Sequence, residues 1–108
     1  MKFTADICVI GGSCTGVFAA IRAARLGKKV ILVDRSGKFG GVATLNFVGM
    51  WHSLYDFEMK EQIIGGLTDE VLKQLERRNA RKGEPRSWST INTEELTLVL
   101  DDFVKQSQ

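Results

Sequence analysis

The feature that most constrains this 108-residue sequence is a glycine-rich turn between two short apolar runs. The first run, residues 7–10, ends directly at the turn, and the second, residues 30–33, follows an alanine-rich segment. Continuously apolar runs of this length are typical of strands buried on both faces, as in parallel sheets. The segment between the runs has helical spacing and stops at Gly27, so the region predicts a right-handed β-α-β unit.

The turn resembles the dinucleotide-binding pattern G-x-G-x-x-G, in which each glycine has a separate mechanical role. Gly11 would make the tight turn out of the strand, and Gly16 would let the helix pack closely on the sheet. The middle glycine is replaced by Ser13, the smallest side chain that carries a hydroxyl. We expect backbone amides at the positive end of the helix dipole to hold a pyrophosphate. The residues of this predicted turn are Gly11, Gly12, Ser13, Cys14, Thr15 and Gly16.

An acidic residue, Asp34, closes the second apolar run. A carboxylate at this position accepts hydrogen bonds from the ribose hydroxyls of the adenosine. It would repel a ribose 2′-phosphate, which disfavours NADP, although the adjacent Arg35 could offset the repulsion and would flank the adenine. The sequence therefore predicts a socket for the ADP half of a dinucleotide, and this pattern alone does not separate FAD from NAD.

A second glycine pair, in the pattern G-G-x-A-T, follows at residues 40–44. Together with the upstream turn, it makes residues 5–45 resemble the N-terminus of bacterial FAD-dependent oxidoreductases. These enzymes belong to the glutathione-reductase-like superfamily with two dinucleotide-binding domains. The resemblance implies that Gly40, Gly41 and Thr44 pass the ribityl side of FAD, and that hydride transfer through FAD acts on a small-molecule substrate of unknown identity. Two alternatives remain: an NAD-binding module of a dehydrogenase, and a catalytically inactive truncated fragment.

The rest of the sequence predicts helices. Glu61 to Asn79 has an apolar stripe at helical spacing, and Asn92 is an N-cap for a second helix that runs to about Lys105. The expected class is therefore α/β, a Rossmann-like β-α-β unit followed by two helices, with an incomplete sheet. We divide the partial domain, residues 1–108, into a β-α-β core over 5–35, a glycine-rich loop over 36–56 and a helical segment over 57–108.

Relatives of this kind are several times longer, so we expect an N-terminal piece of a larger enzyme that is inactive by itself. Two strands alone would leave both sheet edges open, which predicts either a homodimer or association with further domains. The net charge of +2 argues against nucleic acid or a membrane surface as partner. The sequence has no run long enough to span a membrane and does not begin like a signal peptide, which favours the cytoplasm. A basic stretch predicts a solvent-facing helix end and loop, or else a site that binds phosphate or an acidic partner. It comprises Arg77, Arg78, Arg81, Lys82 and Arg86.

The remaining chemistry-bearing residues give weaker signals. Cys8, inside the first apolar run, is expected to be a small buried side chain, and Cys14 mainly to present its backbone amide, although a helix start can favour thiol redox chemistry. His52 would exchange a proton during hydride transfer, or be an ordinary loop residue. Trp51 and Tyr55 would stack on a flavin, or simply pack. No spacing of metal ligands, paired carboxylates or nucleophile elbow is present.

Overall fold

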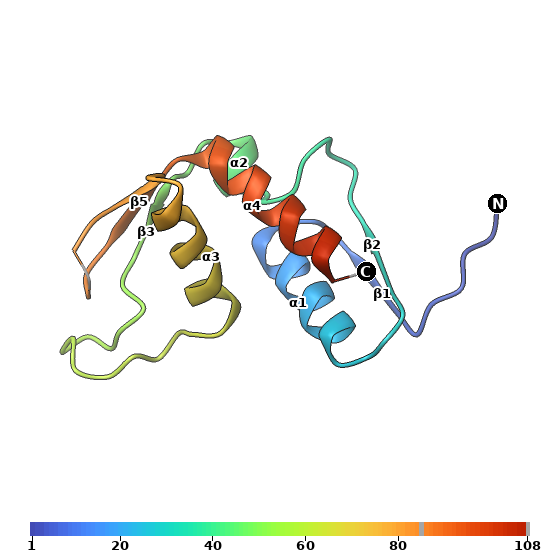
Figure 1. The fold of residues 1–108 in the computed structure, drawn as a ribbon, viewed down its shortest axis with the longest axis horizontal. Coiled ribbons are helices and arrows are strands. Elements are labelled where there is room, and N and C mark those ends of the chain that lie inside the picture. The colour runs from blue at the N-terminus through green and yellow to red at the C-terminus, as the bar shows by residue number, and fades with distance from the viewer. Residues whose placement is uncertain (85, 108) are drawn as a thin grey trace.

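The computed structural model describes residues 1–84 and 86–107. The molecule is elongated, with extents of 49 × 26 × 22 Å, and the β1-α1-β2 unit lies at the end opposite to a second, small sheet (Figure 1). The predicted α/β class with a Rossmann-like β-α-β start is confirmed. In chain order the elements are β1 (Ile7–Ile10), α1 (Cys14–Arg25), β2 (Val30–Val33), α2 (Val42–Leu45), β3 (Met50–Trp51), α3 (Leu67–Arg77), β4 (Arg81–Lys82), β5 (Ser89–Ile91) and α4 (Thr93–Gln106).

The β1-α1-β2 unit follows the predicted pattern. β1 and β2 are parallel, in a register that pairs Ile7 with Val30 and Ile10 with Val33. Helix α1 buries the face that carries Val17 and Ile21. The chain turns away after the helix at Gly27, whose φ of +81° glycine adopts without steric penalty.

The prediction that both strands are buried on both faces is wrong. Side chains alternate across a sheet, and α1 covers only the face that carries Val9 and Leu32. On the opposite face Ile10 is 79% exposed, and no described element covers it. Cys8 points to that same open face and is exposed, so its expected burial is also wrong.

Helices α3 and α4 supply most of the hydrophobic core. The stripe predicted for the last helix is confirmed, because Leu96, Val99, Leu100 and Phe103 are all buried. The predicted N-cap is also confirmed: the side-chain oxygen of Asn92 accepts hydrogen bonds from the first-turn amides of α4. The core joins these two helices to α1; its buried residues are Val17, Ile21, Ala43, Val71, Leu72, Leu75, Ala80, Ile91, Leu96, Val99, Leu100 and Phe103.

The middle of the chain contains more regular structure than predicted. The segment 36–56, expected to be a loop, contains α2 and β3, and the segment 57–108, expected to be helical, contains β4 and β5. The last three strands form an antiparallel sheet in the order β3-β5-β4. Helix α3 begins at Leu67 rather than at Glu61, because Gly66, with a φ of +67°, turns the chain immediately before it.

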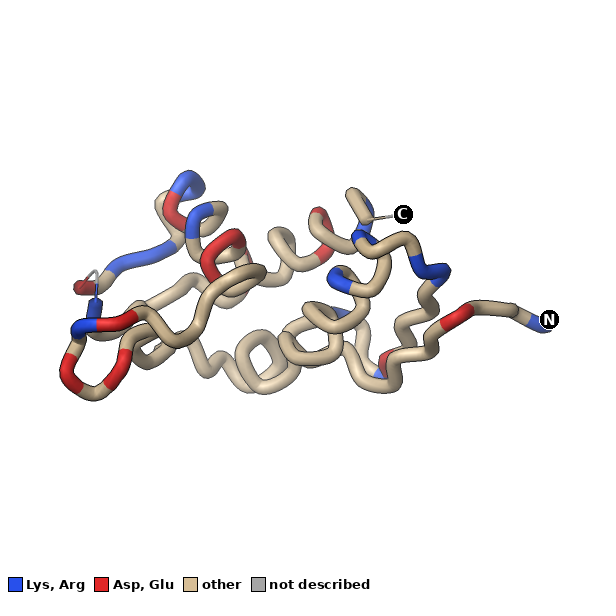
Figure 2. The backbone as a smooth tube through the Cα atoms, turned by 90° about the horizontal axis from the view of Figure 1, so that it is seen from below, with Lys and Arg blue, Asp and Glu red and all other residues tan. Residues whose placement is uncertain are grey.

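Charges of both signs intermix at the end of the molecule formed by α3 and β4 (Figure 2). Arg78 lies 3.1 Å from the carboxylate of Glu95 and 2.7 Å from that of Asp102, and Arg81 donates a 2.9 Å hydrogen bond to Ser89. Part of the basic stretch therefore ties α3 to α4 and β4 to β5. Among the described residues, no helix combines the length and the apolar character needed to cross a membrane.

Candidate dinucleotide-binding site

The corner between β1 and α1 is closed by direct contact between two glycines. Gly11 has a φ of +106°, and its amide donates a 2.7 Å hydrogen bond to the carbonyl of Val33, which ties the corner to the end of β2. A side chain at Gly16 would overlap the carbonyl oxygen of Gly11. Close approach of α1 to the strand end therefore requires glycine at this position, as the sequence pattern predicts.

Ser13, which stands at the middle position of the pattern, is the N-cap of α1. Its backbone is extended, with φ −63° and ψ 170°, and its hydroxyl accepts a 3.4 Å hydrogen bond from the amide of Gly16. Neither feature requires glycine. Cys14 and Thr15 contribute first-turn amides, which have no acceptor within an α-helix and carry the positive end of its dipole. This end of α1 is therefore suited to an anionic group.

Asp34 is anchored to the same corner. Its Oδ2 accepts a hydrogen bond of 2.5 Å from the amide of Gly12, and its Oδ1 accepts from the amide of Ser36 at 2.6 Å and from the Ser36 hydroxyl. The Ser36 hydroxyl, followed by the amides of Gly12 and Ser36, lowers the pKa of the Asp34 carboxyl below its ordinary value. A negative charge is therefore held beside the glycine turn, while the adjacent Arg35 is exposed.

Sequence reasoning missed two residues that shape this corner. Ser36 was not identified, although an aspartate is a known signal for a turn in which its carboxylate accepts the backbone amide two residues later. Phe39 was also missed: its Cδ1 lies so close to Gly12 that a Cβ added there would be 2.6 Å away. Nothing in the local sequence indicates this contact, since it depends on how the loop after β2 folds back.

The second glycine pair lies against the first glycine turn. The amide of Gly40 donates a 2.8 Å hydrogen bond to the carbonyl of Gly12, and a Cβ on Gly41 would lie 3.0 Å from the Cβ of Ser13. Both Gly40 and Gly41 have positive φ, at +114° and +57°. The structure thus brings together the two glycine segments that the sequence placed in one site.

Two other site residues have side chains that are wholly or partly buried. Thr44 is fully buried, and its hydroxyl donates a 2.6 Å hydrogen bond to the carbonyl of Phe39, so it stabilises the loop from inside. Its expected contact with a ribityl chain stays a prediction. The Cys14 thiol lies 3.6 Å from the carbonyl oxygen of Gly40, and burial raises the pKa of that thiol. A raised pKa disfavours the reactive thiolate.

The aromatic and histidine candidates lie next to the small antiparallel sheet. Trp51 packs against the core, and the ring of Tyr55 is covered by the guanidinium of Arg86 at 5.5 Å. His52 is exposed, and its neighbours come from β4, β5 and the loop between them. These contacts account for Trp51 and Tyr55 as packing residues.

A strand-to-helix glycine corner with a carboxylate at the end of the neighbouring parallel strand defines a Rossmann-like dinucleotide-binding unit. Comparison with known proteins places the chain more narrowly. It belongs to the FAD dependent oxidoreductase family, whose model matches residues 6–108.

Two known proteins illustrate the range of the similarity. The mitochondrial dihydrolipoyl dehydrogenase of Schizosaccharomyces pombe is 56% identical over 36 residues, which cover 33% of this chain and 7% of that protein. The crystal structure of Thermovibrio ammonificans THI4 matches with a TM-score of 0.59 at 15% identity, over 95% of this chain and 36% of that one. At that identity the likeness concerns the fold. The chain spans well under half the length of either protein.

Proposed function

We propose that this chain binds FAD through the glycine corner, as the cofactor-binding part of a flavin-dependent oxidoreductase that transfers hydride. The family is FAD-dependent, and one observation carries the assignment of the site. The ionised carboxylate of Asp34 is fixed, through the Gly12 amide, beside the N-terminus of α1. An acceptor for ribose hydroxyls and a donor surface for phosphate thus lie at the same corner.

The pyrophosphate would lie against the start of α1. The first-turn amides of Cys14 and Thr15 offer donors, and the helix dipole favours negative charge there. Gly11 has positive φ, and a Cβ on it would meet no atom within 4 Å, so its backbone leaves room for a cofactor to approach. This arrangement suits a phosphate-bearing ligand of any dinucleotide class.

The adenosine ribose would lie at Asp34. Each carboxylate oxygen has two lone pairs, so an oxygen that already accepts from Gly12 or Ser36 can accept a second hydrogen bond from a hydroxyl. The lowered pKa of Asp34 keeps the group ionised at neutral pH, and an ionised carboxylate repels a 2′-phosphate. The site therefore favours FAD or NAD over NADP, with Arg35 beside the adenine.

Bound FAD supplies the hydride chemistry, and the residues of this chain position the cofactor. Gly40 and Gly41 would pass the ribityl side, since they pack against the glycine turn. Thr44 would act through its backbone, because its hydroxyl is already bonded to Phe39. The substrate would be a small molecule bound away from the glycine corner.

Titration of the purified chain with ADP, FAD and NADH tests the proposal. Flavin absorbance in the purified protein, or FAD binding tighter than NADH binding, supports FAD; colourless protein that prefers NADH supports the NAD module instead. Asp34→Asn should weaken ADP binding by about 10- to 100-fold, the effect of losing a hydrogen bond to a charged group. Asp101→Asn, on α4, is the matched control and should leave the affinity unchanged. Equal ADP affinities of the two variants would contradict the assignment of Asp34.

A second candidate function is a binding module without turnover. The uncovered sheet face, on which Ile10 is 79% exposed, favours a chain that depends on other polypeptide for a complete fold. An assay of flavin reduction by the 108-residue chain separates the candidates. Steady turnover would eliminate this second candidate, whereas FAD binding without turnover would favour it.

A further inference from the structure

The carboxylate of Asp34 is almost fully hydrogen-bonded within the chain. An ionised carboxylate offers about four acceptor positions, two on each oxygen. At Oδ1 both hydrogen bonds come from Ser36, one from its amide and one from its hydroxyl. Oδ2 accepts one hydrogen bond, from the amide of Gly12. A ligand hydroxyl is therefore left with a single acceptor position, on Oδ2.

The Ser36 hydroxyl has one proton to donate and two acceptors within reach. The carbonyl oxygen of Lys38 lies 3.0 Å from the Ser36 Oγ, and Oδ1 of Asp34 lies closer. A hydrogen bond to an ionised acceptor is shorter and stronger than one to a neutral carbonyl. The proton therefore goes to Asp34, and Oδ1 keeps no acceptor position for a ligand.

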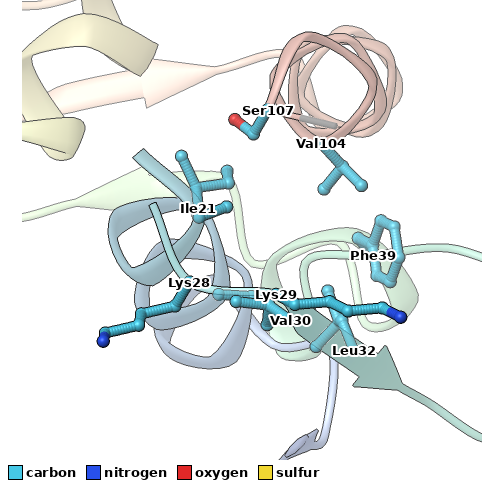
Figure 3. A pocket seen from close by; sticks show the side chains of 10 residues that line it. Ile21, Lys28, Lys29, Val30, Leu32, Phe39, Val104 and Ser107 are labelled. Atoms are coloured by element: carbon cyan, nitrogen blue, oxygen red, sulfur yellow. The ribbon is translucent and has the colours of Figure 1, made fainter. Parts of the chain in front are cut away.

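Phe39 holds the loop that carries Ser36 in place. Its ring points into a groove of about 370 Å³ between α1, β2 and α4, where Leu32 and Val104 also form the wall (Figure 3). The same ring lies against Gly12, at the other side of the carboxylate. Because Phe39 contacts both the core and the glycine turn, Ser36 is fixed relative to the corner that it shares with Asp34.

We propose that Asp34 binds a single ribose hydroxyl of the ADP moiety, through Oδ2, and that Ser36 is the positioning residue that determines this by occupying Oδ1. Both roles rest on the proposed function, since they specify how the same site holds the ribose. A carboxylate with both oxygens free could accept the 2′- and 3′-hydroxyls together, one on each oxygen. Here the two hydroxyls should contribute unequally, because only one of them reaches a charged acceptor.

Calorimetric titration of the full chain with ADP, 2′-deoxyADP and 3′-deoxyADP tests the proposal. One of the two analogues should bind about 10- to 100-fold more weakly than the other, the effect of losing one hydrogen bond to a charged group. In Asp34→Asn this difference should shrink, because a neutral amide oxygen is a weaker acceptor. Two analogues that bind the wild type equally well would overturn the proposal, and so would a difference that persists undiminished in Asp34→Asn.

Two variants of Ser36 test its positioning role. Ser36→Ala removes the hydroxyl and keeps the amide, so the carboxylate can turn and offer a position on either oxygen. The two analogues should then bind within about threefold of each other, and Ser36→Thr, which retains a hydroxyl, should restore the wild-type difference. General damage to the site would weaken both analogues alike and leave their ratio unchanged. An unchanged ratio in Ser36→Ala therefore overturns the role of Ser36.

Ser53→Ala is the matched control for the serine variants. Its hydroxyl donates a 2.6 Å hydrogen bond to the carbonyl of Arg86, beside the small antiparallel sheet. This substitution also removes one hydroxyl that is bonded within the chain, but away from Asp34. The ratio of the two analogue affinities should stay at its wild-type value, and a ratio that fell as in Ser36→Ala would contradict a specific effect of Ser36.

Asp34→Asn separates failure of this proposal from failure of the proposed function. If it weakens ADP binding relative to Asp101→Asn while the two analogues bind the wild type alike, Asp34 contacts the ribose and the single-hydroxyl arrangement is wrong. If Asp34→Asn leaves the ADP affinity unchanged, or if ADP does not bind, the proposed function fails and this proposal fails with it.

Discussion

Replacement of Gly16 by alanine tests whether the glycine corner is as tightly closed as the structure indicates. In an exposed helix this change stabilises, because alanine is favoured over glycine by about 0.8–1 kcal/mol. At Gly16, however, the new Cβ would overlap the carbonyl oxygen of Gly11 and lie 3.6 Å from a methyl carbon of Val9. The overlapped atom belongs to the backbone, and the amide of Gly11 is bonded to Val33, so no side chain can rotate away.

The expected magnitude follows from these two opposing effects. Overpacking of a well-packed site costs about 1–3 kcal/mol, and overlap with fixed backbone belongs at the upper end of that range. After subtraction of the gain in helix propensity, Gly16→Ala should lower the free energy of unfolding by about 2 kcal/mol. For a domain of this size each kcal/mol lowers Tm by about 4–8 °C. Displacement of the first turn of α1 should also weaken ADP binding.

Urea unfolding followed by far-ultraviolet circular dichroism measures the stability, and calorimetric titration measures ADP affinity. Gly37→Ala is the matched control, since a Cβ at that position meets no atom within 4 Å and the backbone is not left-handed. The control should leave stability unchanged or raise it by up to about 1 kcal/mol. If Gly16→Ala proves as stable as the wild type, the close contact between α1 and Gly11 is refuted.

Three further predictions address the carboxylate, a helix cap and the two thiols. Asp34→Asn should lower the free energy of unfolding at neutral pH. Urea unfolding at a series of pH values should show that the difference in this free energy between variant and wild type shrinks on acidification. The reason is that a carboxyl with a lowered pKa in the folded state stabilises the fold above its unfolded-state pKa, and this stability is lost as the pH falls through the folded-state pKa. Asn92→Ala removes the acceptor of two first-turn amides and should cost about 1 kcal/mol in the same assay; a loss of a few tenths would show that the cap contributes little. Mass spectrometry after alkylation at mildly alkaline pH should find exposed Cys8 modified on the order of tenfold faster than Cys14, whose pKa is raised by burial; the reverse order would contradict the burial of Cys14.

The β-α-β unit could be predicted because its signals are local and agree with one another. Each strand is a short apolar run, the helix between them has a regular apolar spacing, and Gly27 ends that helix in a conformation that favours glycine. The last helix was equally clear from its N-cap, Asn92, and its apolar stripe. In both regions the local preference and the tertiary packing favour the same structure.

The small antiparallel sheet could not be predicted, because it lacks such local signals. Its strands have two or three residues, too few to show a period of two, and they pair across loops whose path depends on tertiary contacts. Exposure on the open face of β1 was missed because an apolar run indicates which residues prefer burial, and does not indicate what covers them. Cys8 and Ile10 illustrate this, since both belong to an apolar run typical of a buried strand and both lie on an uncovered face.

For the site, the sequence predicted which residues lie together but not the hydrogen bonds and contacts between them. Gly12 and Asp34 were both identified as cofactor contacts, and the structure adds a hydrogen bond between them that orients the carboxylate. Thr44 was identified for a cofactor contact, and the structure adds a hydrogen bond from its hydroxyl to the carbonyl of Phe39. Such internal bonds join residues far apart in the chain, so no local pattern encodes them. The contacts of all these residues with FAD stay predictions.

The second glycine pair explains how Ser13 fits at a position where the dinucleotide-binding pattern has glycine. A side chain at position 13 occupies space at the corner, and Gly41 packs directly against it: a Cβ on Gly41 would lie 3.0 Å from the Cβ of Ser13 and 3.2 Å from its Cα. The absence of a side chain at Gly41 therefore accommodates Ser13, while the Ser13 hydroxyl gains the N-cap bond that a glycine could not make. In the glycine pattern a single glycine at the middle position allows the close approach of backbone at this corner. Here two segments, the turn with Ser13 and the second pair with Gly41, allow it together, and the hydrogen bond from the Gly40 amide to the Gly12 carbonyl joins them. The two glycine-rich segments consequently form one structural unit, and a substitution in either should alter the structure of the other.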